Sequence, residues 1–454
     1  MYRKNAWRKY KDKKVIFDFA EGYKEFLSYA KTERMAVQEA KMMLLDNGFV
    51  DGEKVKTLKK GDRVFFINKN KNVAAFIIGK KPLKDGLKIL GAHIDSPRLD
   101  IKENPLYENH DLVLADTHYY GGIKKYQWVT YPLALHGVFV KKSGDVVEIH
   151  IGDEPNDPVF GITDLLIHLA KDQMAKTAEK VIEGENLDIS FGNIPSNEVD
   201  GTVKENILNI LKQKYDIEEE DFISAEIEAV PAGKARDYGL DRSMIAGYGH
   251  DDRSCAYTSL KALIDSKNVE YTAVCLLVDK EEIGSVGASG AESLFFENLI
   301  AKLAEKVGDS HPLYTARIAL ENSKTISSDV SAAYDPLYPS VLEEKNCAYF
   351  GYGIVFNKYT GARGKSGSND TNPEYYAYIR KIMDESNVCW QNSELGKVDQ
   401  GGGGTIAYIM GNYNMNVIDA GIPVHNMHAP MEIVSKVDVY EAYLAYKAFI
   451  AFKE

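Results

Sequence analysis

The chain lacks the features that mark several classes of protein. It has only 4 cysteines in 454 residues, at positions 255, 275, 347 and 389, and none forms a CxxC pair. This spacing excludes a disulfide framework and a cysteine zinc site, and it favours the reduced thiols of a cytoplasmic protein. No apolar run approaches the length of a membrane span, and the basic segment at 1–14 lacks the apolar stretch of a secretory signal. We therefore expect a cytoplasmic protein with no membrane partner.

Positive charge is also in short supply. Lysine and arginine together number 55 against 67 aspartates and glutamates, which gives a net charge of −12. A chain with this balance is not a general binder of nucleic acid and would be repelled by anionic membranes. Its length of 454 residues exceeds what one small core supports, so we expect two domains or one large domain with an insertion.

The spacing of apolar residues predicts an α/β fold interrupted by a β-rich insertion. Strands are expected at 73–79, 87–93 and 272–278, a hairpin at 133–152, and helices at 22–47, 161–174, 202–214 and 436–452. We therefore expect a discontinuous α/β domain of residues 1–101 and 241–454, with a mixed central sheet flanked by helices. Residues 102–240 would form the inserted β-rich domain.

Two adjacent acids, Glu281 and Glu282, follow the apolar run of residues 272–278. Taken alone, the pair is most simply a solvated acidic turn. However, sites in open α/β sheets are built at the carboxyl ends of strands, and an unpaired charge buried there would be costly. One acid could then bind a metal while its neighbour, on the other side of the backbone, transfers a proton.

Further metal-ligand residue types stand at the ends of other apolar segments. His93 ends a predicted strand and is followed by Asp95, which can fix the tautomer of a metal-binding imidazole. Asp251 and Asp252 precede a predicted helix, where they serve either as helix caps or, one of them, as a carboxylate that bridges two metals. Spacing alone does not choose between the two aspartates.

Two more segments complete the candidate set. Asp329 lies among small residues that would let the backbone pack closely around a site, although an Asx turn has the same composition. His425 and His428 both lie in the segment GIPVHNMHAPME, where each is either a ligand or a polar surface residue. We treat His250, beside Asp251, as a neighbour of the site and not as a ligand.

Together these residues have the composition of a paired-metal site. Two histidines, two aspartates and one glutamate supply one bridging acid and two terminal ligands for each ion. Imidazole with carboxylate suits zinc, and also cobalt or manganese. A further acid must take a proton from the bridging water, and Glu281, beside the ligand Glu282, supplies that acid.

The same residues make the chain resemble the aminopeptidase I and aspartyl aminopeptidase family of dinuclear zinc metallopeptidases. The matching segments keep the family's order over nearly the whole chain: GAHIDSPRLDIK, YGGIKKYQWVTYPLALHG, GHDDRSCAY, DKEEIGS, SSDVSAA and MHAPME. The resemblance implies that the α/β domain is a metallopeptidase catalytic domain, which hydrolyses the N-terminal bond of peptides with a free N-terminus. It also implies two metal-ligand sets: His93, Asp251 and Asp329 for one ion, and Asp251, Glu282 and His428 for the other.

The resemblance implies further roles and an assembly. Asp95 would orient His93, and Glu281 would be the general base and then the acid that protonates the leaving amine. The inserted domain would mediate dimer contacts within a homo-oligomer, a tetrahedral dodecamer. Two alternatives stay open: a related dinuclear amidohydrolase, such as a deacylase or carboxypeptidase, and a catalytically inactive scaffold on the same fold.

The chain departs from the aspartyl-specific pattern around the expected substrate pocket. Relatives of that type carry histidines where this chain has Ala332 and the pair Asp335-Pro336. The glycine run 401–404 either walls the pocket by close backbone approach or forms a flexible turn. Lys358 remains a candidate for a substrate carboxylate, against the simpler interpretation of a solvated lysine. The preferred N-terminal residue is therefore open.

Overall fold

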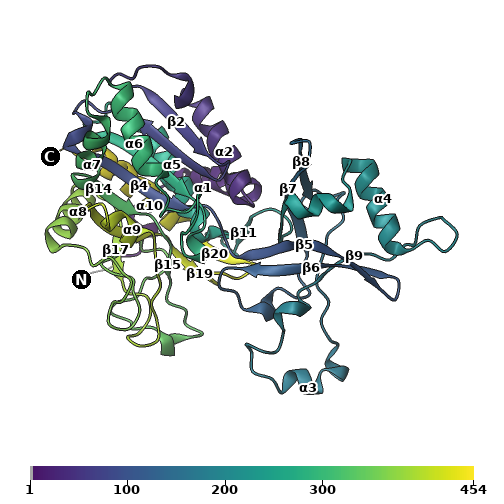
Figure 1. Ribbon diagram of the computed structural model, residues 1–454. Helices are drawn as coiled ribbons and strands as arrows, with labels where there is room; N and C mark the ends of the chain where they lie inside the picture. Colours follow the sequence, from purple (N-terminus) through teal and green to yellow (C-terminus); the bar gives the residue numbers. More distant parts are fainter. Residues whose placement is uncertain (1–3, 454) are drawn as a thin grey trace. The chain divides into compact units, whose positions relative to one another are not determined.

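A computed structural model describes residues 4–453 of the chain (Figure 1). The described residues form two compact units. The first comprises the described residues of Met1–Asp95, Ala235–Met427 and Glu432–Glu454, and the second comprises Ser96–Lys234 and His428–Met431. The domain boundaries predicted from the sequence lie at 101/102 and 240/241, and the roles of the two parts, catalysis and dimerisation, stay predictions. Among the described residues, no helix combines the length and the apolar content needed to cross a membrane.

The first unit is built on a nine-stranded mixed sheet with the strand order β1-β2-β3-β13-β4-β14-β18-β16-β17. Neighbours β13, β4, β14 and β18 run parallel, whereas β2 with β3, β3 with β13 and β18 with β16 pair antiparallel. The expected mixed central sheet is thus confirmed. The strands are β1 (Val50–Asp51), β2 (Arg63–Asn68), β3 (Asn72–Ile77), β4 (Leu87–His93), β13 (Thr272–Val278), β14 (Lys324–Ser327), β16 (Ile354–Asn357), β17 (Trp390–Ser393) and β18 (Asn416–Gly421).

Helices cover both faces of this sheet and bury a separate core on each (Figure 1). Successive side chains of a strand point to opposite faces, so a strand covered on both faces needs a continuous apolar run. In β13, Ala273, Cys275 and Leu277 enter one core, and Val274, Leu276 and Val278 enter the other. The first core contains α1 (Lys14–Tyr29), α2 (Glu33–Asp46), α5 (His250–Ile264), α8 (Pro373–Glu385) and α10 (Lys436–Ala451), and the second contains α6 (Phe295–Lys306), α7 (Pro312–Glu321) and α9 (Ala407–Gly411).

The N-terminal helical region is interrupted. The single helix expected over 22–47 is wrong, because α1 ends at Tyr29 and α2 begins at Glu33. Ala30 leaves the helical conformation with ψ of 58°, and the Thr32 side chain accepts a hydrogen bond from the Met35 backbone N–H. Thr32 is therefore an N-cap that starts a new helix. The expected core residues Phe26, Ala30, Val37, Ala40 and Leu44 are nevertheless all buried.

A second, five-stranded sheet in the first unit holds the segments that lead into the candidate site. Its order is β11-β12-β20-β19-β15. Strand β12 precedes α5, β15 follows Asp329, and β20 begins at Glu432. The bounds are β11 (Arg236–Tyr238), β12 (Met244–Gly247), β15 (Ser331–Ala332), β19 (Pro423–His425) and β20 (Glu432–Ser435).

The second unit is a six-stranded antiparallel sheet, ordered β8-β7-β10-β5-β6-β9, with one long helix, α4 (Val203–Tyr215). The predicted hairpin is present as β7 (Leu133–Val140) and β8 (Val146–Ile151). The other strands are β5 (Arg98–Asn109), β6 (Leu112–Tyr120), β9 (Ile189–Gly192) and β10 (Ala225–Pro231).

The helix predicted at 161–174 is wrong. Only α3 (Lys171–Met174) and a 3₁₀ turn at Ile167–Leu169 are helical in that stretch. Only Ile162 and Ala170 of its apolar side chains are buried, whereas Ile167 is 68% exposed and Leu169 is 70% exposed. A helix gains most of its stability by burying an apolar face, and this segment leaves most of its apolar side chains exposed.

Candidate metal centre

The candidate residues of the first unit gather at one edge of the central sheet. His93 ends β4, whose neighbours β13 and β14 run parallel to it. Because parallel strands end at the same edge, the loops that follow them meet there. Those loops carry Glu281 and Glu282 after β13, and Asp329 two residues after β14. The sheet register therefore brings together residues that are far apart in the sequence.

His93 is the centre of the cluster and is buried. Its Nε2 lies 3.2 Å from Asp251 Oδ1, and 4.0 Å from both Glu281 Oε2 and Asp329 Oδ1. Burial alone would lower the pKa of His93, but hydrogen bonds with Asp251 and Asp95 raise it well above its ordinary value. Three carboxylates therefore face one imidazole nitrogen, and such a concentration of negative charge favours a bound cation.

Asp95 connects the histidine to the two glutamates. Its Oδ1 lies 3.3 Å from His93 Nδ1. The same carboxylate accepts the backbone N–H of Glu281 at 3.2 Å and that of Glu282 at 3.1 Å. Asp95 thus orients the imidazole and caps the short 3₁₀ helix Glu281–Ile283. Sequence reasoning assigned it only the first of these two tasks.

Asp251 and Asp252 begin α5 with non-helical backbone angles, and the peptide bond between them is cis. The Asp251 N–H donates to Glu432 Oε2 at 3.0 Å. Asp252 is fully buried, and neither of its carboxylate oxygens has a hydrogen-bond partner among residues 4–453. Burial and the charge of Asp251 raise the pKa of Asp252 well above its usual range. The Asp251 carboxylate lies 3.2 Å from His93 Nε2, which supports it as the ligand of the pair.

Asp329 reaches the cluster because β18 passes very close to it. A Cβ at Gly421 would lie 1.8 Å from the Asp329 carbonyl oxygen, so only glycine fits at this position. Burial and the neighbouring carboxylates of Asp252 and Asp251 raise the pKa of Asp329 well above its usual range. The small residues around Asp329 predicted close backbone packing, and the approach of Gly421 to the Asp329 carbonyl confirms it.

Sequence reasoning missed two acids of this region. Glu432 accepts the Asp251 N–H and is buried, although it lies inside the segment MHAPME that was used for His428. Asp279 directly follows β13 and accepts a hydrogen bond from Ser289 Oγ at 2.6 Å. Burial, then the charges of Glu33 and Asp95, raise the pKa of Asp279 to about 7. Asp279 lies two residues before Glu281, and Glu432 lies four residues after His428. Proximity in the sequence to a predicted site residue was therefore the signal available for each acid.

The remaining histidines have separate environments. His250 Nδ1 lies 2.6 Å from Tyr23 Oη, and burial lowers its pKa to about 3, so it is a neutral neighbour. His425 Nε2 lies 3.0 Å from the Tyr334 carbonyl oxygen. His428 belongs to the second unit, where its Nδ1 donates to the Gly122 carbonyl at 2.8 Å. That bond places the proton on Nδ1 and the lone pair on Nε2. Its place among the ligands stays a prediction.

The residues of the cluster fit a divalent cation. One ligand atom each from His93, Asp251 and Asp329 lies within 4.8 Å of the other two. Without a cation, burial and mutual repulsion favour protonated carboxyl groups at Asp252 and Asp329. A divalent ion would reverse this preference, because a bound cation is the largest local charge in such a site. Imidazole with carboxylates is a donor set that suits zinc.

Comparison with known proteins places this geometry in a family. The family model described as aminopeptidase I zinc metalloprotease (M18) matches residues 26–450. A probable M18 family aminopeptidase 1 of Clostridium acetobutylicum is 57% identical over 455 residues and covers 98% of both chains.

Solved structures agree with this placement. The crystal structure of an M18 family aminopeptidase from Thermotoga maritima superposes with a TM-score of 0.96 at 46% identity, covering 99% of both chains. An S. cerevisiae structure described as the mApe1 dodecamer has a TM-score of 0.75 at 18% identity, covering 95% of this chain and 96% of that one, which shows a shared fold alone. The chain belongs to the M18 family of aminopeptidase I zinc metalloproteases and is a metal-dependent aminopeptidase.

Proposed function

We propose that the chain removes N-terminal residues from peptides with two divalent metals, most simply zinc, at the edge of the central sheet. His93, Asp251 and Asp329 would hold one ion, and Asp251, Glu282 and His428 the other. The observation that carries this proposal is the convergence of three carboxylates on His93 Nε2, at 3.2, 4.0 and 4.0 Å. When bound, the metals would lower the pKa of a water molecule and polarise the scissile carbonyl.

The residues of the chain would then position groups and move the proton. Glu281 takes a proton from the attacking water and delivers it to the departing amine. Its side chain is partly exposed, at 16%, so it remains accessible to water and substrate, and Asp95 fixes its backbone N–H. Asp95 also orients His93 as a ligand. Glu432 holds the backbone of Asp251 and thereby the position of the bridging carboxylate.

We propose a preference for neutral N-terminal residues over acidic ones. Lys358 was the remaining candidate to bind a substrate carboxylate, but its Nζ already lies 3.1 Å from Asp370 Oδ1. Burying a second carboxylate beside that pair would add a negative charge without a new partner. Ala332 and Asp335 offer no cation in place of the histidines of acid-specific relatives.

A peptide panel tests the reaction and the preference together. The enzyme loaded with zinc should release the first residue of leucyl and alanyl peptides, leave their N-acetylated counterparts intact, and act slowly on aspartyl and glutamyl peptides. Cleavage of N-acetylated peptides would favour the deacylase or carboxypeptidase alternative instead. Equal rates on leucyl and aspartyl peptides would contradict the preference alone. Metal analysis of the same sample should give two divalent ions per chain.

We also propose a homo-oligomer, a tetrahedral dodecamer, in the cytoplasm. The second unit supports an assembly, because it exposes a cluster of apolar side chains of the kind that marks protein interfaces. The described yeast dodecamer shares the fold. The exposed apolar residues of this segment are Leu165, Leu166, Ile167, Leu169 and Met174.

A further inference from the structure

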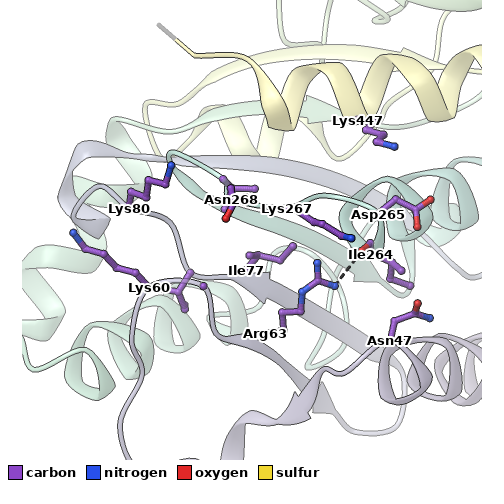
Figure 2. A pocket seen from close by; sticks show the side chains of 13 residues that line it. Asn47, Lys60, Arg63, Ile77, Lys80, Ile264, Asp265, Lys267, Asn268 and Lys447 are labelled. Atoms are coloured by element: carbon purple, nitrogen blue, oxygen red, sulfur yellow. Dashed lines mark hydrogen bonds between the residues drawn. The ribbon is translucent and has the colours of Figure 1, made fainter.

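The first unit has a large pocket that the peptidase reaction does not use. Its volume is about 840 Å³. It lies where β2 begins, β3 ends and α5 ends, with Arg63, Ile77 and Ile264 among its lining residues. Figure 2 shows Lys60 and Lys80 at one end of this pocket, Lys447 toward the other, and Lys267 between them. A second hollow of about 580 Å³ continues from it and shares Lys60, Ile78 and Lys80.

The pocket is remote from the candidate metal centre. Helix α5 carries Asp251 near its first residue and reaches the pocket with its last, Ile264. At 1.5 Å per residue, this separation corresponds to roughly 20 Å. The strands give the same relation, because Thr272, the first residue of β13, lines the second hollow, whereas the glutamates follow the last.

The pocket wall is strongly basic. Five of its thirteen lining residues are cationic and one, Asp265, is anionic. The second hollow adds Lys59, Lys81 and Lys84, against one acid, Asp309. This density of positive charge contrasts with the net charge of −12 of the whole chain. The five cationic residues of the first pocket are Lys60, Arg63, Lys80, Lys267 and Lys447.

Three lysines of the first pocket are not paired with a carboxylate in the described part of the chain. Among residues 4–453, no carboxylate oxygen lies within 4.0 Å of the Nζ of Lys60, Lys80 or Lys267, and all three side chains are exposed. The one acid is already engaged, since Asp265 Oδ1 lies 3.0 Å from Lys261 Nζ and its Oδ2 accepts from Tyr443 Oη at 2.8 Å. The positive charge is therefore available to a ligand.

Arg63 fixes the shape of the pocket. Its Nη1 donates to the Ile264 carbonyl at 3.0 Å (Figure 2). Its Nη2 donates to the Ser266 carbonyl at 2.6 Å, so Arg63 ties β2 to the end of α5. The guanidinium group of Arg63 is thus already bound to backbone carbonyl groups, so the lysines are the residues that would bind a ligand. A lysine ammonium group binds a phosphate oxygen as a point charge. It does not form the planar pair of hydrogen bonds with which arginine binds a carboxylate.

We propose that this pocket binds a compact oligophosphate, a soluble ligand with two or more adjacent phosphate groups. The volume is in the range of small-molecule sites, roughly 300–1,000 Å³. Lysines at both ends of the hollow match a ligand whose negative charges are spread along a short chain. A long nucleic acid would also meet the acidic remainder of the surface, which disfavours it. Inorganic oligophosphates and nucleoside polyphosphates share this chemistry.

Binding of inorganic tripolyphosphate, ATP and adenosine to the zinc-loaded, full-length enzyme tests the proposal by calorimetry. We expect saturable binding of tripolyphosphate, ATP or both at low salt, weakened as salt is raised, and no binding of adenosine. Combined Lys60→Gln, Lys80→Gln and Lys267→Gln substitutions should weaken binding by roughly tenfold or more, because three charged hydrogen-bond donors are lost. If tripolyphosphate and ATP both bind, the pocket recognises the phosphate groups themselves. If tripolyphosphate binds and ATP does not, the ligand is an inorganic oligophosphate.

A matched variant controls for total charge. Lys171→Gln, Lys180→Gln and Lys214→Gln remove the same three charges from exposed lysines of the second unit. This control should bind as the wild type does, and arginine at positions 60, 80 and 267 should retain binding. Peptidase turnover should be unchanged in every variant, which also reports folding. Absence of saturable binding, equal loss in both glutamine variants, or tighter binding of a single-stranded oligonucleotide than of ATP would overturn the proposal.

Discussion

The two ends of the central parallel strands carry opposite charge in opposite settings. At the carboxyl ends of β4, β13 and β14, acids are buried around His93. Near the amino end of β13, Lys60, Lys80 and Lys267 are exposed to solvent around two hollows. The acids repel one another and raise each other's pKa, whereas these three lysines have no carboxylate oxygen within 4.0 Å of Nζ among residues 4–453. A buried cluster of like charges requires a counterion, whereas an exposed one can persist without a ligand.

This difference has a consequence for experiment. Substitutions at the acidic end should act on catalysis, metal content and the pH dependence of folding, because the charges there are desolvated and coupled. Substitutions at the basic end should act on ligand binding and hardly on folding, because water already solvates the side chains. The comparison fails if the two ends respond alike.

The largest effect is expected at Glu281. Glu281→Gln removes the group that accepts the proton of the attacking water while keeping the size of the side chain. Turnover should fall by about 10²–10⁴-fold or more, and the metal content should stay at the wild-type value. Steady-state kinetics on a leucyl peptide and elemental analysis of the same preparation measure both quantities.

An exposed glutamate provides the control for that experiment. Glu305→Gln on α6 changes the same charge away from the sheet edge and should leave turnover unchanged. Normal turnover in a metal-replete Glu281→Gln enzyme would remove Glu281 from the mechanism. Loss of metal together with turnover would make it a ligand instead of a base.

A smaller effect concerns stability and pH at Asp279. Its pKa in the folded chain is about 7, raised by burial and by the charges of Glu33 and Asp95. The folded state therefore holds this proton more tightly than the unfolded chain, whose aspartates titrate near ~3.9. The stabilisation is fully present below ~3.9 and is lost as the pH rises through about 7.

Asp279→Asn should remove this part of the pH dependence, because asparagine does not ionise. Relative to the wild type, the free energy of unfolding of the variant should rise as the pH increases from ~4 to about 7. Urea unfolding of the metal-free proteins across that range measures it. Exposed Asp85→Asn is the control and should track the wild type. A constant difference between Asp279→Asn and the wild type would mean that Asp279 does not titrate in this window.

Much of the acidic end could be predicted from the sequence. A strand buried on both faces needs a continuous apolar run, so β13 and β4 were visible, and the polar residues that follow such runs were the natural site candidates. The helix at 161–174 was wrong because apolar spacing does not reveal whether a partner surface exists for it. Glu432 was missed because its contact with Asp251 joins segments 181 residues apart.

The basic end was invisible to sequence patterns for a related reason. Its lysines come from four separate segments, around positions 60, 80, 267 and 447. The first three have the composition of ordinary polar turns, and the fourth lies in α10. Only the sheet, which places the start of β2 beside the ends of β3 and α5, collects them into one wall. The net charge of the whole chain indicates an acidic protein and does not reveal a local basic pocket.

The smallest expected effect separates exposure from charge at the basic end. Lys60→Gln should change the free energy of unfolding by at most about 0.5 kcal/mol, because the side chain is exposed and has no carboxylate partner among the described residues. Lys436 is the contrast, since its side chain is fully buried and its Nζ lies 2.8 Å from Asp237 Oδ1. Lys436→Gln should cost more, about 1.5–3 kcal/mol, because a charged hydrogen bond is lost from a buried site while Lys24 and Arg242 still contact Asp237. Urea unfolding at neutral pH measures both. If both substitutions lowered the free energy of unfolding by the same amount, the charge of a lysine, and not its burial, would determine its contribution to stability.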